Sequence, residues 1–224
     1  MLAMGNLYYY GARGLPRDQP LAFDYFNRAA ALGSFEGTVA VANMYLKGEG
    51  GPARNLSHAV VLYRQALEAD ENNVEALNGL GYAYYHGSGD SNCTANSTNS
   101  SSDCGSSVVV ANKTKALEYF ERAAKTDRSS SALFNVGQMY YDGVGTPINR
   151  TLSIYYWDRA VSLFGNFGSI YMLGQVYLYG DEDPDGNTSS GYSGTKRDCH
   201  QVINTLLSIC LLLMIMIMTM TLDL

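Results

Sequence analysis

A seven-residue pattern that ends in glycine recurs five times along this chain and constrains its fold more than any other feature. In every copy a tyrosine stands three residues before the closing glycine, as in Gly81-Tyr-Ala-Tyr-Tyr-His-Gly87. The closing glycines follow one another after 37, 39, 56 and 37 residues: Gly11, Gly48, Gly87, Gly143 and Gly180. A period near 37 residues is typical of a stacked repeat and not of one globular core.

A second block follows each of the first four and has the apolar spacing of an amphipathic helix. Small residues occupy two positions seven residues apart, with aromatic and aliphatic residues between them: Ala22, Ala59, Ala116 and Ser153, then Ala29, Ala66, Ala123 and Ala160. We call the first block helix A and the second helix B, and we expect each closing glycine to be a left-handed cap of helix A. The predicted helices cover residues 1–10, 20–32, 37–47, 56–69, 74–86, 112–126, 131–142, 150–163 and 168–179.

The combined pattern, Ala-x-x-x-Leu-Gly-x-x-Tyr-x-x-Gly-x-Gly followed by Ala-x-x-Tyr-Phe-x-x-Ala-Ala, resembles the Sel-one-like repeat. Residues 132–160 match it well, as do residues 76–124 once an insert is removed. Tetratricopeptide repeats are the close alternative, but their period is 34 residues and their turn is shorter. The resemblance implies an all-α fold, an α-solenoid of antiparallel helix pairs that binds other proteins. It covers residues 1–200, in four full repeats and a degenerate fifth.

The fifth repeat departs from the pattern in its helix B. Arg197-Asp198 matches Arg17-Asp18 of the first repeat, but Val202 and Ile209 stand where small residues are expected. The segment 205–222 then runs for 18 residues without a charge, which is long enough for a transmembrane helix. The alternatives are a buried helix or a tail that is not part of the natural protein.

Seven N-x-Ser/Thr sequons occur, where composition alone would produce roughly two. All lie in predicted inter-helix loops or at the start of a helix B, where a glycan would project into solvent. We therefore predict exposure to a secretory lumen and glycosylation at Asn55, Asn92, Asn96, Asn99, Asn112, Asn149 and Asn187.

The polar insert at residues 91–110 has the composition of an unstructured loop. Cys93 and Cys104 lie near its ends. In an oxidising lumen we expect them to form a disulfide, whereas in a reducing cytosol they would stay free thiols.

The motifs of catalysis and ligand binding are missing from the sequence. Only three histidines are present, none has a nucleophile at motif spacing, and the G-x-G pairs follow predicted helices instead of strands. We therefore expect a protein that is not an enzyme, with no cofactor and no metal. Its net charge of −6, without a basic stripe, argues against a nucleic-acid partner.

Repeats, sequons and an apolar C-terminal segment together resemble the lumenal adaptors of endoplasmic-reticulum membrane ubiquitin ligases, used in endoplasmic-reticulum-associated degradation. The resemblance implies an endoplasmic-reticulum membrane protein with lumenal repeats, held by the C-terminal span. Its partners would be the membrane ubiquitin ligase, lectins and misfolded glycoproteins. A cytosolic signalling scaffold of the same repeat type is the alternative, and a secreted repeat hydrolase is less favoured. Because the chain begins inside a helix A, we expect it to be a fragment.

Overall fold

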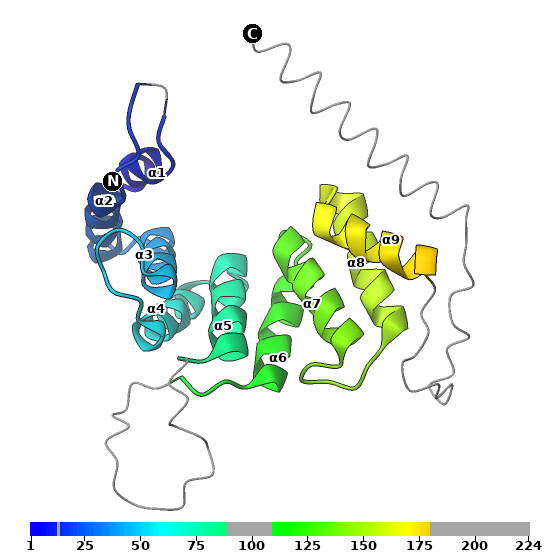
Figure 1. Ribbon diagram of the computed structural model, residues 1–224. Helices are drawn as coiled ribbons and strands as arrows, with labels where there is room; N and C mark the ends of the chain where they lie inside the picture. Colours follow the sequence, from blue (N-terminus) through cyan, green and yellow to red (C-terminus); the bar gives the residue numbers. More distant parts are fainter. Residues whose placement is uncertain (13, 89–108, 180–224) are drawn as a thin grey trace, which may run out of the picture. The chain divides into compact units, whose positions relative to one another are not determined.

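The structure is a computed structural model that describes residues 1–12, 14–88 and 109–179. The regular elements in these ranges are all helices, apart from an isolated bridge between Ala12 and Leu15 (Figure 1). The predicted all-α fold is confirmed, and every predicted helix end lies within two residues of its place in the structure. The helices are α1 Leu2–Tyr10, α2 Gln19–Ala31, α3 Phe35–Lys47, α4 Leu56–Ala69, α5 Val74–His86, α6 Lys113–Ala124, α7 Ser130–Asp142, α8 Arg150–Phe164 and α9 Phe167–Tyr179.

The chain forms two compact units, residues 1–128 and 129–224. The first contains three helix A–helix B hairpins, α1–α2, α3–α4 and α5–α6, and each hairpin packs on the next one through α2 on α3 and α4 on α5. The described part of the second unit contains the hairpin α7–α8, with α9 packed on α8. Alternating A and B helices therefore follow the repeat that the sequence predicts.

In each hairpin, the residue immediately before helix B is bonded to both helices. This residue is an Asp or Asn whose side chain caps helix B, as expected for an N-cap. Its backbone N–H also donates to the carbonyl of the repeat tyrosine on helix A, at 2.8 to 2.9 Å. The four bonds are Asp18 to Tyr8, Asn55 to Tyr45, Asn112 to Tyr84 and Asn149 to Tyr140.

The two small-residue positions of helix B are buried in every described hairpin, as predicted. All eight residues have 3% or less of their surface exposed. The approach is close where α2 meets α3, because a Cβ added at Gly37 would lie 2.8 Å from the backbone nitrogen of Ala30. Small residues at these positions therefore let successive helices pack at short range.

The prediction that the repeat glycines are left-handed caps is only partly right. Gly48 and Gly143 have left-handed conformations, and the next N–H of each donates back to the carbonyl five residues earlier. Gly11 and Gly87 instead combine a positive φ with an extended ψ of 162° and −179°. There the next N–H donates forward into the loop, from Ala12 to Leu15 and from Ser88 to Val109, so the chain leaves the helix without the return bond. Gly180 lies outside the described residues.

Candidate interaction surface

The three sequon asparagines that the structure describes are the N-caps of α4, α6 and α8. Asn55, Asn112 and Asn149 are exposed. The Oδ1 of each accepts the backbone N–H three residues on, at 2.9 to 3.0 Å. An N-linked glycan is attached at Nδ2, so capping and glycosylation use different atoms of the same side chain.

Capping accounts for these asparagines but not for the hydroxyl residue two positions later. Asp18 caps α2 equally well and is followed by Pro20 at that position. Asn73 caps α5 and is followed by Glu75, so it is not a sequon. Sequons therefore coincide with the Asn caps of helices B and not with that of α5. The remaining predicted sites, Asn92, Asn96, Asn99 and Asn187, and the cysteines Cys93 and Cys104 lie outside the described residues.

In three of the four described hairpins, α3–α4, α5–α6 and α7–α8, the loop edge also carries a cation that binds the end of helix A. Arg54 Nε donates to the carbonyl of Leu46 at 3.2 Å, and Lys113 Nζ donates to that of Tyr85. Arg150 donates to the carbonyl of Tyr141 at 2.6 Å. The last carbonyls of a helix lack partners within it and carry partial negative charge, so these cations stabilise the helix ends.

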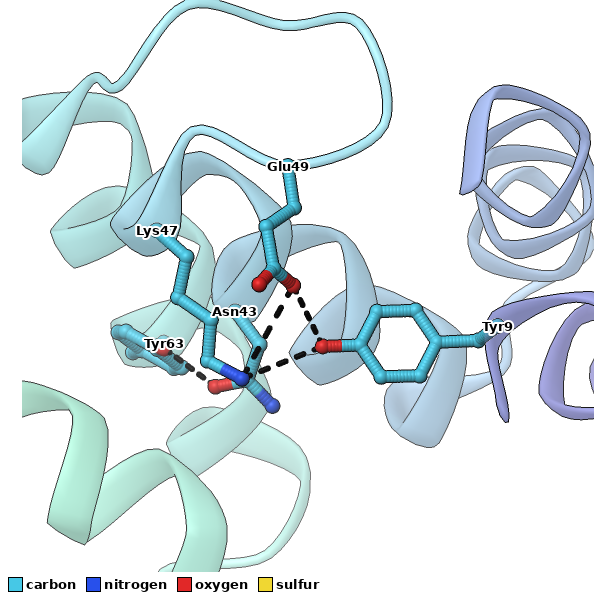
Figure 2. A network of polar contacts seen from close by, with 5 residues as sticks. All are labelled: Tyr9, Asn43, Lys47, Glu49 and Tyr63. Carbon is cyan, nitrogen blue, oxygen red and sulfur yellow. Dashed lines mark hydrogen bonds and ion pairs between the residues drawn. The ribbon is translucent and has the colours of Figure 1, made fainter. Parts of the chain in front are cut away.

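A polar network joins the first two hairpins where their A helices end (Figure 2). The hydroxyl of Tyr9 donates to Glu49 Oε2 at 2.6 Å, and Lys47 Nζ donates to the same hydroxyl at 3.2 Å. Lys47 and Glu49 form a looser ion pair at 4.0 Å. The network was not predicted from sequence because Tyr9 and Glu49 are 40 residues apart.

The ionisation of this network suits recognition or packing better than catalysis. Partial burial and the hydrogen bond to Glu49 raise the pKa of Tyr9, and the hydrogen bond to Tyr9 raises the pKa of Lys47. A tyrosine that acts as a base needs a lowered pKa, and here the phenol stays protonated with a charged lysine beside it. At the end of α5, the pKa of His86 is lowered by partial burial and by the charges of Lys113 and Arg54.

A second pair in Figure 2 lies deeper in the unit. The hydroxyl of Tyr63 donates to Asn43 Oδ1 at 2.6 Å, and Tyr63 is fully buried. Burial, followed by the charge of Glu75, raises the pKa of Tyr63 above its usual range. This tyrosine therefore acts in packing.

Most repeat tyrosines serve packing as well. Three of them stack on a tyrosine of their own helix B, with ring planes within 6° of parallel. The tyrosines with the most exposed rings are others: Tyr10, Tyr82, Tyr155 and Tyr171. On α5, Tyr82 lies beside His86 with ring centroids 4.3 Å apart. Exposed polar and aromatic side chains on the A helices of the first unit, among them Tyr82 and His86, thus form the candidate interaction surface.

Two further observations concern chemistry and membranes. Within residues 1–12, 14–88 and 109–179, no three His, Cys, Asp or Glu side chains gather in a way that would hold a metal ion. None of the helices in the same ranges combines the length and apolar character that crossing a bilayer requires. The predicted span 205–222 lies outside them.

Comparison with known proteins assigns the family. No curated protein sequence matches the chain. Among solved structures, the Sel1 repeat protein from Oxalobacter formigenes is similar over 92% of this chain and 70% of its own, with a TM-score of 0.60 and 20% identity. The protective antigen c5321 of uropathogenic Escherichia coli strains, which displays an SLR fold, is similar over 92% of this chain and 44% of its own, with a TM-score of 0.56 and 20% identity. At this identity the two structures show the fold alone.

The family model for the Sel1 repeat matches most of the chain. Its matches follow the helix hairpins and continue through α9: residues 1–34, 36–71, 74–92, 103–125, 130–163 and 168–192. The chain therefore belongs to the Sel1 repeat family.

Proposed function

We propose that this chain is a non-catalytic adaptor whose repeats lie in the lumen of the endoplasmic reticulum. There it binds misfolded glycoproteins and lectins and presents them to a membrane ubiquitin ligase for degradation. Sel1 repeats form helical scaffolds that bind proteins, which supports the general part of this function. The specific part depends on one observation, the coincidence of sequons with exposed N-cap asparagines in three hairpins.

A helix cap explains an asparagine but places no demand on the residue two positions later. Ser57, Thr114 and Thr151 complete the three sequons, and glycosylation requires a hydroxyl residue there. All three attachment sites lie at the start of a helix B, in a loop edge that the helix–helix contacts leave exposed.

The test is made on the natural protein, purified from its own cells with an antibody against the repeats. We expect endoglycosidase to lower its apparent mass and glycopeptide mass spectrometry to find glycans at Asn55, Asn112 and Asn149. We also expect a membrane ubiquitin ligase to co-purify. A protein without glycans would favour the cytosolic scaffold, the second candidate, since capping alone would then account for the three asparagines.

Variants separate the glycan from the cap. Asn112→Asp keeps a capping oxygen and removes the attachment nitrogen, while Thr114→Val keeps the cap intact and destroys the sequon. In a secretory expression system both should lose one glycan, and Asn112→Asp should keep the stability of the deglycosylated wild-type protein. Asn112→Ala, the matched control, should also lose about 1 kcal/mol of stability because the cap is gone.

A further inference from the structure

Three basic side chains from different segments of the first unit meet near the end of α5. Arg54 lies in the loop just before α4, His86 is the last residue of α5, and Lys113 is the first residue of α6. Nζ of Lys113 lies 3.4 Å from the ring centroid of Tyr85, and the ring centroids of Tyr85 and His86 are 5.0 Å apart. Arg54 and Lys113 are both near enough to His86 for their charges to lower its pKa.

The positive charge of this cluster has no acidic partner among the described residues. Neither Arg54 nor Lys113 forms an ion pair there, and Glu49, the acid of the α3–α4 loop, is bonded to Tyr9 and Lys47. Partial burial lowers the pKa of Lys113, as expected for an ammonium group without a nearby carboxylate. Each cation uses one N–H for the carbonyl at a helix end, so further N–H donors remain for a ligand.

An exposed aromatic ring lies beside the cluster. Tyr82 stands one turn before His86 on α5, their ring centroids are 4.3 Å apart, and Tyr82 is 42% exposed. The same position of α1 and α3 holds Asn6 and Asn43, so in the first unit this ring is particular to α5. Donors that converge on one point fit a single carboxylate, and a ring beside them fits an apolar side chain. A protein segment offers both, whereas a membrane surface would be matched by cations spread over a wide face.

We propose that Arg54, His86 and Lys113 bind a carboxylate in an acidic segment of a protein partner, while Tyr82 packs on an adjacent apolar side chain. The site does not depend on the lumenal placement proposed above, because it uses only contacts within the first unit. It gives the candidate interaction surface a preference for acidic protein segments.

Binding at this site should be linked to the uptake of a proton. The groups around His86 are Tyr82 and Tyr85 on its own helix, Arg54 before α4 and Lys113 at the start of α6. Both neighbouring charges are positive, so the imidazole of the unbound protein favours its neutral form. A bound carboxylate favours the charged form, and the complex should therefore be tighter at about pH 6 than at about pH 7.5.

Peptide titration tests the site in the full chain. A fluorescein-labelled peptide of glutamate, serine and one leucine is compared with a peptide in which glutamine replaces every glutamate. Arg54→Gln and Lys113→Gln should each weaken binding of the acidic peptide about 10-fold, as expected for the loss of a hydrogen bond to a charged group. Lys125→Gln is the matched control, since it removes the same charge at the other end of α6, and its effect should stay below about twofold. An equal effect of Lys125→Gln, or equal binding of the two peptides, would overturn the proposal.

Two further measurements avoid the helix-end contacts of the cations. Tyr82→Ser changes an exposed side chain and should weaken binding about threefold without lowering the Tm. NMR titration of the wild-type protein should show that the pKa of His86 rises when the acidic peptide binds. His86→Gln assigns the signal and should remove the pH dependence of binding. An unchanged pKa in the saturated complex would contradict the proposal, as would binding to vesicles of phosphatidylcholine and phosphatidylserine without binding to the peptide.

Discussion

The hairpins α3–α4 and α5–α6 share one pattern but place the aromatic residue of helix B differently. In α5–α6, the ring of Phe120 packs against Gly81 of its own helix A, where a Cβ would lie 2.6 Å from the ring. In α3–α4 the repeat position of Gly81 is occupied by Ala42, and the ring of Tyr63 lies instead against Gly79 of α5, in the following repeat. A Cβ at Gly79 would be 2.2 Å from Cζ of Tyr63, so this fit is as close as the other one.

The tyrosine on helix A also has different partners in the two hairpins. Tyr84 of α5 stacks on Tyr119 of its own hairpin, with centroids 5.7 Å apart. Leu62 replaces that second tyrosine in α3–α4, and Tyr45 contacts both His58 of its own helix B at 4.5 Å and Phe23 of the preceding repeat at 5.7 Å. The aromatic position of helix B can therefore stabilise either a hairpin or the contact between hairpins, depending on where glycine stands.

The largest expected effect on stability comes from removing the rings of Phe120 and Tyr63. Phe120→Ala and Tyr63→Ala should each cost about 3–5 kcal/mol of unfolding free energy, because both side chains are buried and leave a cavity. Hydrogen exchange should distinguish them. Phe120→Ala should loosen α5 and α6 against each other, while Tyr63→Ala should loosen α4 against α5. Identical exchange patterns would show that the difference in placement has no energetic meaning.

The second test uses the closing glycines of the same two hairpins. Asparagine tolerates the left-handed conformation of Gly48, so Gly48→Asn should cost about 1 kcal/mol or less. Gly87→Asn should cost about 2 kcal/mol or more, and Gly87→Val at least as much. The reason is that φ of 67° with ψ of −179° is almost restricted to glycine, and a Cβ would lie 2.9 Å from the nitrogen of Ala111. Denaturant midpoints of the variants measure these losses. Equal losses for Gly48→Asn and Gly87→Asn would contradict the different backbone conformations assigned to the two glycines.

The third test concerns the hydroxyl of Tyr63. Its counterpart at the same position of α5–α6, Phe120, has none. Tyr63→Phe should cost about 1.5 kcal/mol, since Asn43 Oδ1 loses its donor. The pKa of Tyr63 is raised in the folded state, so folding favours the protonated phenol. Wild-type stability should then be unaffected by this group below pH 10 and fall above it, by about 1.4 kcal/mol per pH unit. The difference between wild type and Tyr63→Phe should shrink above pH 10, and a constant difference would be evidence against the buried phenol.

The smallest expected effect comes from the stacked tyrosines. Tyr119→Leu copies the residue of α3–α4 into α5–α6 and should cost about 0.5–1 kcal/mol, because an aromatic pair is lost at a half-buried site. Leu62→Tyr is the reverse change and should have little effect, since Tyr45 already contacts Phe23. A clear gain of stability in Leu62→Tyr would show that stacking within a hairpin is preferred wherever tyrosine allows it.

The sequence alone determined the helices, their pairing and the positions of closest approach. Helical periodicity, caps and turn residues act over a few residues, so a repeat near 37 residues reports them directly. The same local logic placed Asp18, Asn55, Asn112 and Asn149 at the start of each helix B, and it marked the small residues that are buried between helices.

Only the tertiary structure decided where the large side chains lie. Whether Tyr63 contacts its own helix A or the next one depends on Ala42 and Gly79, which lie on different helices. The network of Tyr9, Lys47 and Glu49 likewise joins hairpins across 40 residues. The extended exit at Gly87 is accompanied by a hydrogen bond from Ser88 to Val109, near the far end of the insert. These choices are settled by packing and hydrogen bonds between residues distant in sequence, and no local pattern encodes such contacts.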